Sequence, residues 1–101
     1  MTHTPTLLDV ASDLRRCIYA SFDEGEFNNK NFLIFWNNAQ KILRPMQNNL
    51  DSHTKKLITK QLNKSQNKTV SLEKRREDLL LVASLLQNYT HSINYESKRN
   101  I

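Results

Sequence analysis

The chain has 101 residues, of which 38% are hydrophobic and 25% charged, and it carries a formal net charge of +5 with a sequence pI of about 9.6. This length suits one domain (1–101) with a modest core, and the composition excludes a disordered chain. The longest apolar run, Leu79 to Ala83, is too short to cross a bilayer, so no membrane segment is expected.

One Gly and two Pro leave few turn signals for a protein of many strands, and the apolar residues recur at helical spacing. The pattern predicts an all-α fold. A first helix is expected over 6–22, with Cys17 beside an apolar face that comprises Leu7, Ala11, Leu14, Ile18 and Phe22. Asp23-Glu24-Gly25 is the clearest loop of the chain.

A second helix is expected over 30–44, capped by Asn28 or Asn31. Its narrow apolar arc comprises Phe32, Phe35, Trp36, Ala39, Ile42 and Leu43. Aromatics interleaved with cations can stack nucleobases, but rings at helical spacing more often form core, and we interpret these as core. Pro45 lacks a backbone donor and restricts the residue before it, which predicts a break or kink after Arg44. Residues 46–49 are then either the first turn of a new helix or a connection.

A third helix is expected over 46–64, and here a charge pattern coincides with a helical one. Leu50, Thr54, Leu57, Ile58, Gln61 and Leu62 fall on one side, whereas His53, Lys56, Lys60 and Lys64 fall on the other. No acidic residue lies between Asp51 and Glu73, so this row of cations has no neighbour at i+4 to neutralise it.

The last helix is expected over 71–94, with Ser71 as its N-cap and a core face of Leu79, Val82, Ala83, Leu86, Tyr89 and Ile93. Lys74, Arg75 and Arg76 oppose the helix dipole in its first turn, which favours a role toward a partner. A solvated face with ion pairs such as Lys74 to Asp78 explains them equally well. Residues 1–5 and the tail 95–101 are expected to fray.

Three leucines, Leu80, Leu81 and Leu85, lie outside the core face of the last helix. A helix that is apolar nearly all round is either central in the fold or has a second face against another chain. The chain is too small to surround it easily, which favours a protein interface, including self-association, at these residues.

Residues 27–76 have a net charge of +9, whereas 1–26 have −3 and 77–101 have −1. A polycation of this kind attracts polyanions, of which nucleic acid is the commonest. The alternative is that the lysines only keep a small protein in solution. The candidate nucleic-acid contacts are Lys41, Arg44, Lys55, Lys56, Lys60, Lys64, Lys68, Lys74, Arg75 and Arg76.

No pattern of catalytic or metal-binding residues is present. His3, His53 and His91 are isolated from one another and from Cys17, so neither a metal site nor a cofactor is expected. The amphipathic position of Cys17 argues against an exposed nucleophile. We therefore expect a non-enzymatic protein, and a cytoplasmic one because the N-terminus lacks the pattern of a signal peptide.

In size, helix count and charge the chain resembles the small all-helical subunit of CRISPR effector complexes. That resemblance rests on no diagnostic motif and transfers no residue. It implies a basic face that holds RNA or single-stranded DNA within a larger assembly, and a helix face for neighbouring subunits. The alternative function is a protein-interaction module, such as an inhibitor, an immunity protein or an adaptor. Either function fits a small four-helix, mostly antiparallel bundle.

Overall fold

The helical periodicity of the sequence becomes four α-helices over residues 6–99, which are the residues that the computed structural model describes. The helices are α1 (Leu7–Ala20), α2 (Lys30–Met46), α3 (Ser52–Ser65) and α4 (Leu72–Arg99). Single 3₁₀ turns at Glu26–Asn28 and Gln47–Asn49 flank α2. No strand occurs within the described range, so the predicted all-α class is confirmed.

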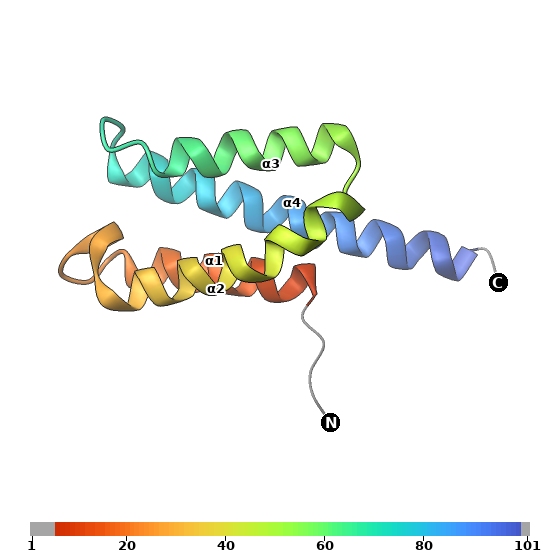
Figure 1. Cartoon of the computed structure of the whole chain (residues 1–101), viewed down its shortest axis with the longest axis horizontal. Coiled ribbons are helices and arrows are strands. Elements are labelled where there is room, and N and C mark those ends of the chain that lie inside the picture. The colour runs from red at the N-terminus through yellow and green to blue at the C-terminus, as the bar shows by residue number, and fades with distance from the viewer. Residues whose placement is uncertain (1–5, 100–101) are drawn as a thin grey trace, which may run out of the picture.

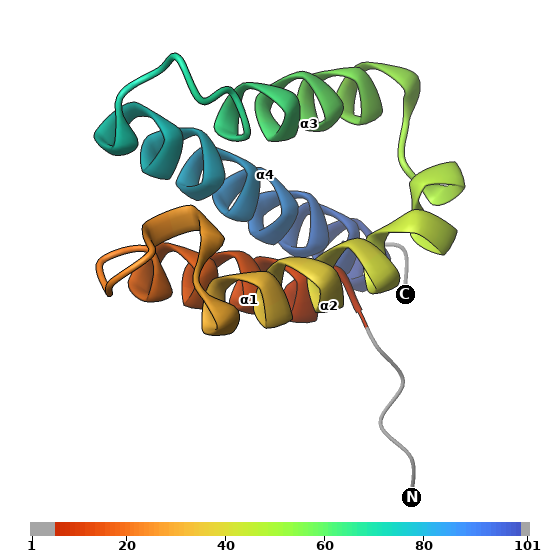
Figure 2. The same cartoon turned by 60° about the vertical axis from the view of Figure 1, so that its left-hand side comes forward.

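Helix α4 lies between α1 and α3, and α2 packs against α1 on its other side (Figures 1 and 2). Each pair of packed helices runs antiparallel, as predicted. Because α3 packs mainly on α4, it forms an outer edge of the molecule with a long solvent side. The order of the helices in space is therefore α2, α1, α4, α3.

The core is formed where the apolar arcs of the helices meet. Phe32, Ala39 and Leu43 from α2 are buried, and Phe35, Trp36 and Ile42 pack against them, so the interpretation of the α2 aromatics as core is confirmed. From α4 the core takes Leu79, Val82, Ala83 and Leu86, and from α3 it takes Ile58 and Leu62. Ile93 lies outside the residues whose side chains are described.

Helix α1 ends at Ala20, earlier than predicted, because side-chain bonds terminate it. The amide nitrogen Nδ2 of Asn29 donates to the carbonyl oxygen of Ala20 at 2.6 Å, and Oδ1 of Asn29 accepts from the backbone nitrogen of Phe32 at 2.8 Å. Asn29, rather than Asn28 or Asn31, is therefore the cap of α2. The placement of Phe22 in the core was wrong: its side chain lies beyond the helix and is 67% exposed.

The break predicted at Pro45 lies slightly later, since α2 continues to Met46 and Gln47–Asn49 forms the connection. The predicted start of the third helix at residue 46 was wrong, because α3 begins at Ser52. Pro45 lies in the last turn of α2, so the hydrogen bond that it cannot donate to the carbonyl four residues earlier is lost only just before the helix ends. The carboxylate of Asp51 instead starts α3, by accepting a hydrogen bond from the backbone nitrogen of Thr54 at 3.1 Å. Hydrogen bonding from the side chain of Thr54, and then from its backbone nitrogen, lowers the pKa of Asp51 below its ordinary value.

Helix α4 begins after Ser71, whose hydroxyl accepts from the backbone nitrogen of Lys74 at 3.2 Å, so the predicted N-cap is confirmed. The helix continues to Arg99 and not only to 94. The hydroxyl of Tyr89 donates to the carbonyl oxygen of Asn49 at 3.2 Å and ties α4 to the connection before α3. The expected fraying of 1–5 lies outside the described residues.

Candidate functional site

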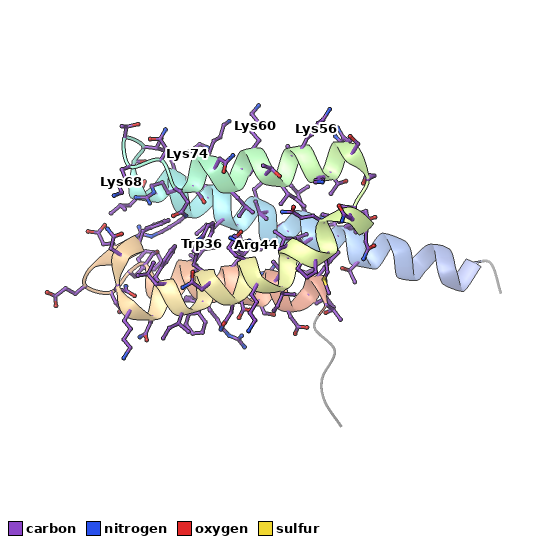
Figure 3. The ribbon with its side chains drawn as sticks, viewed as in Figure 1. Trp36, Arg44, Lys56, Lys60, Lys68 and Lys74 are labelled. Atoms are coloured by element: carbon purple, nitrogen blue, oxygen red, sulfur yellow. The ribbon has the colours of Figure 1, made fainter. Side chains whose placement is uncertain are left out.

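A polar stripe runs along the solvent side of α3. It consists of Ser52, Lys55, Lys56, Thr59, Lys60 and Asn63, which border a shallow, open depression and are termed the lysine face. Their spacing (i, i+3, i+4, i+7, i+8, i+11) places them on one side of a helix whose other side buries Ile58 and Leu62. Figure 3 shows Lys56 and Lys60 pointing away from the other helices.

The lysine face is positively charged and unneutralised. Helix α3 contains no acidic residue, and Asp51 before it is engaged in capping the helix. Within the described part of the chain, Lys55, Lys56 and Lys60 make no ion pair. The hydroxyl groups of Ser52 and Thr59 and the amide of Asn63 add neutral hydrogen-bond donors between the ammonium groups. The chemistry of this surface suits an extended anion.

Of the ten predicted nucleic-acid contacts, the structure gathers only part of the set around α3. Lys55, Lys56, Lys60 and Lys64 are exposed on this helix, and Lys68 is exposed in the loop that follows it (Figure 3). Lys41 and Arg44 are exposed on α2, a helix that packs on α1 rather than forming the α3 surface. The remaining three, Lys74, Arg75 and Arg76, belong to the first turns of α4.

Arg75 was predicted as a nucleic-acid contact, and this was wrong because its side chain is buried and only 8% exposed. Its Nε donates to the carbonyl oxygen of Ser65 at 2.7 Å, and its guanidinium lies 3.9 Å from the centre of the Phe27 ring. Burial lowers the pKa of Arg75, and the nearby carboxylate of Glu26 partly offsets this by raising it. Arg75 joins α3 to α4 and is not available to a phosphate.

Arg76 holds the end of α1 in the same manner, although its side chain is only half-buried. Its Nε donates to the hydroxyl of Ser21 at 2.7 Å, and Nη2 donates to the carbonyl oxygen of Ser21 at 2.9 Å. The guanidinium lies 4.0 Å from the centre of the Phe22 ring. Arg76 was predicted as a phosphate contact, but two of its five N–H donors serve the fold.

Lys74 is exposed but not free. Its ammonium group lies 3.3 Å from Oδ1 of Asp78 and 3.8 Å from Oε2 of Glu77, so the ion pair that the sequence offered as an alternative is present. Asp78 is 2% exposed, and its second oxygen, Oδ2, has no hydrogen-bond partner among the described residues. Lys74 therefore balances a buried carboxylate, which reduces the positive charge that it offers to a ligand.

The predicted protein-interface leucines are found outside the central core. Leu80 and Leu81 are exposed, and Leu85 is half-buried. Leu80 faces α1, whereas Leu81 follows it by about 100° around the helix. The three side chains therefore do not form one flat patch.

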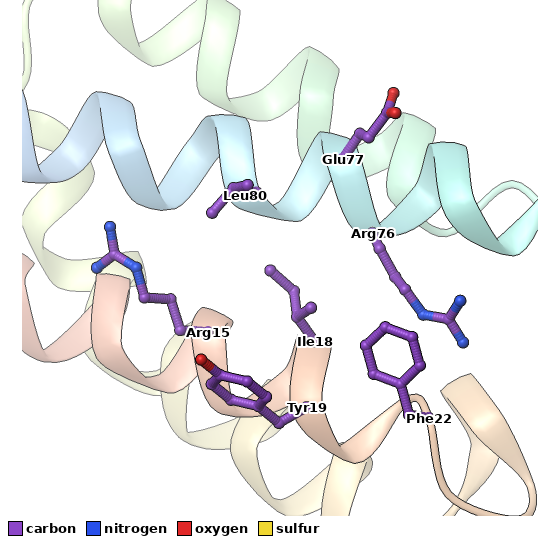
Figure 4. Close-up of a pocket in the computed structure, with 7 residues that line it drawn as sticks. All are labelled: Arg15, Ile18, Tyr19, Phe22, Arg76, Glu77 and Leu80. Atoms are coloured by element: carbon purple, nitrogen blue, oxygen red, sulfur yellow. The ribbon is translucent and has the colours of Figure 1, made fainter.

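A groove of about 320 Å³ lies between α1 and α4 and was not predicted from the sequence. Its lining residues are Arg15, Ile18, Tyr19, Phe22, Arg76, Glu77 and Leu80 (Figure 4). Tyr19 is 75% exposed. Tyr19 is not among the residues that the sequence assigned to the core face of the first helix, which was the one available signal. Only the early end of α1 brings Phe22 into the groove.

Features of other functional classes are few in the described part of the chain. No group of three His, Cys, Asp or Glu side chains is placed to hold a metal ion. Cys17 is buried, and burial, with a smaller effect of Asp13, raises the pKa of its thiol to about 12. Among residues 6–99, no helix has both the length and the apolarity needed to cross a membrane.

Comparisons with protein-family models, curated proteins and solved structures found no match.

Proposed function

We propose that this protein binds nucleic acid through the lysine face of α3, by contacts with the phosphate backbone that do not read base sequence. The observation that supports the proposal is the coincidence of Lys55, Lys56 and Lys60 on one solvent face of a helix that has no acidic residue. Counterion release from nucleic acid by such a surface supplies affinity without sequence specificity.

The spacing of the cations suits a chain of phosphates. Lys56, Lys60 and Lys64 recur every four residues, and each step advances about 6 Å along the helix axis. One strand of a duplex carries a phosphate about every 3.4 Å of its axis, so this row faces several phosphates at once. Lys68, in the loop after α3, extends the cations beyond the end of the helix.

The binding takes place within a larger nucleoprotein assembly in this proposal. The resemblance to the small subunit of CRISPR effector complexes favours such a role, and the exposure of Leu80 and Leu81 on α4 favours contact with a neighbouring protein. A protein-interaction module without nucleic acid is the second candidate, and the same two leucines are the observation in its favour.

The test of the first function is a fluorescence-anisotropy titration of labelled single-stranded and duplex oligonucleotides across salt concentrations. The variant Lys56→Glu/Lys60→Glu is compared with Lys30→Glu/Lys41→Glu, which changes the net charge equally on the exposed surface of α2. We expect the α3 variant to bind more than tenfold more weakly, with a log–log salt slope shallower by about two. An equal loss of nucleic-acid affinity in both variants would show that binding depends on the net charge of the protein and not on the lysine face.

The second candidate is tested by sedimentation of the wild-type chain and of Leu80→Gln/Leu81→Gln. If the leucines form an interface between copies, the wild type sediments as a concentration-dependent oligomer and the variant as a monomer. A chain that binds no nucleic acid at low salt but associates through these leucines would favour the second candidate over the first.

A further inference from the structure

The two most exposed large apolar side chains on the described surface are aromatic and lie side by side in one groove. Tyr19 belongs to the last turn of α1, and Phe22 follows two residues after that helix ends. Both line the groove between α1 and α4, with Ile18 and Leu80 as its aliphatic parts (Figure 4). Aromatic side chains have large apolar surfaces and are usually buried. Two solvent-exposed rings in one groove therefore indicate a binding surface.

The Phe22 ring and the two arginines of the groove are held in place by the fold. The guanidinium of Arg76 lies on the Phe22 ring at 4.0 Å and is itself fixed by two hydrogen bonds to Ser21, which is fully buried. On the α1 side, Nη2 of Arg15 donates to Oε1 of Gln87 at 2.6 Å. Both arginines are therefore ordered, so little side-chain entropy remains to be lost when a ligand binds.

We propose that this groove takes unstacked bases of a single-stranded nucleic acid, with Tyr19 and Phe22 as the stacking surfaces. This inference rests on the proposed function, because it assumes that the lysine face holds the phosphate backbone. Base stacking on aromatic rings and on guanidinium planes tolerates any base sequence. This agrees with the proposed contacts of α3, which are to the phosphate backbone and do not read base sequence. It predicts a preference for single strands, whose bases are free to leave the stack.

The charges around the groove favour a polyanion over an apolar helix. Arg15 and Arg76 place two cations among the lining residues, against the single carboxylate of Glu77. The guanidinium groups keep unused N–H donors for phosphate oxygens, since a guanidinium has five. A groove for a partner helix would be expected to present mainly aliphatic side chains at helical spacing. In this groove, the two rings contribute the most exposed apolar surface.

The aromatic part of the groove and the C-terminal end of α3 lie at the same end of the molecule. The end of α1 lies at the same end of the molecule as the loop that carries Lys68 and the start of α4 (Figures 1 and 3). A strand that leaves α3 at its C-terminal end therefore meets Lys68 on the way toward the groove. This arrangement assigns backbone contacts to α3 and base contacts to the α1–α4 groove.

The test compares the full-length wild type with Tyr19→Ala/Phe22→Ala, using a labelled oligothymidine strand and a labelled duplex of equal length. We expect the variant to bind the single strand about tenfold or more weakly, with the salt slope unchanged, and to bind the duplex as the wild type does. Tyr19→Phe/Phe22→Tyr keeps both rings and restores binding. Circular dichroism verifies that each variant is folded.

A second readout follows stacking directly. A strand that contains 2-aminopurine should change its fluorescence on binding to the wild type and to the Tyr19→Phe/Phe22→Tyr variant, but not on binding to the alanine variant. Unchanged single-strand affinity in the alanine variant overturns the groove proposal and leaves the lysine face intact. If the alanine variant loses self-association but not nucleic-acid binding, the groove is a protein interface and the proposal is equally overturned.

Discussion

The Nε atom of Arg75 donates a hydrogen bond of 2.7 Å to the backbone carbonyl oxygen of Ser65 and thereby fastens the first turn of α4 to the last residue of α3. That carbonyl is one of the acceptors that a helix end leaves without an intrahelical partner. The cation also lies at the negative end of the α3 dipole. A residue that the sequence suggested as a phosphate contact is therefore a structural connection between two helices.

Replacement of Arg75 is expected to destabilise the fold more than replacement of an exposed cation does. In Arg75→Met the apolar stem is kept, but the charged hydrogen bond to Ser65 and the contact with Phe27 are lost. We expect the free energy of unfolding to fall by about 2 kcal/mol. Urea denaturation followed by circular dichroism measures it.

The control for Arg75 is Lys60→Met, since Lys60 is exposed and makes no ion pair within the described residues. Its effect on stability is expected to stay within about 0.5 kcal/mol. Equal stability of wild type and Arg75→Met would mean that the Ser65 carbonyl is satisfied as well by water. In that case the connection would have no energetic role.

Asn29 carries two separable roles at the junction of α1 and α2, because its carbonyl oxygen caps α2 while its amide nitrogen donates to Ala20. Asn29→Asp keeps the capping acceptor but places a carboxylate against the Ala20 carbonyl oxygen. Asn29→Ala removes both bonds. We expect losses of about 1–2 kcal/mol for Ala and a smaller loss for Asp, measured by urea denaturation. An Asp variant less stable than the Ala variant would mean that repulsion exceeds the value of the cap.

The fold was largely predictable from the sequence because apolar periodicity reports which face of a helix is buried. The pattern located Ile58 and Leu62 on the inner side of α3 and Phe32 and Leu43 on that of α2. Helix ends were less predictable because they depend on single hydrogen bonds. Asn29 capped α2 in place of its neighbours, and the resulting shift in the end of α1 moved Phe22 from the predicted core to the surface.

The candidate site was predictable only where charge followed helical periodicity. Lys56 and Lys60 were placed correctly on the outer side of α3 because their spacing matches the turn of a helix. Arg75 could not be placed, because a long side chain beside a core can reach either solvent or a helix end. Which helix end lies beside α4 is a tertiary property that composition and spacing do not encode.

Exposed lysines are expected to contribute unequally to nucleic-acid affinity. Lys60 has no anionic partner among the described residues, whereas Lys74 lies 3.3 Å from the buried carboxylate of Asp78. We expect Lys60→Gln to weaken binding about two- to fivefold and Lys74→Gln to change it less than twofold, since one phosphate contact is lost only in the former. Anisotropy titrations at a fixed salt concentration compare them. A larger effect of Lys74→Gln would place the binding surface on α4.

Cys17 makes stability depend on alkaline pH. Burial raises the pKa of its thiol from about 9 to about 12, so between these values the unfolded chain ionises while the folded chain does not. The contribution is fully present below pH 9 and is lost as the pH rises toward 12. Between pH 8 and pH 10 this one group is expected to reduce the free energy of unfolding by about 1 kcal/mol.

Other groups also titrate in that range, so the comparison is with Cys17→Ala, which keeps the lysines and tyrosines. The variant loses some packing at every pH, but its stability should decline less steeply from pH 8 to pH 10 in urea titrations. At pH 8 the native thiol should resist alkylation by iodoacetamide until urea unfolds the chain, because the reactive thiolate is scarce and the side chain is fully enclosed. Parallel pH slopes in the two proteins, together with rapid alkylation of the native wild type, would mean that Cys17 is open to solvent.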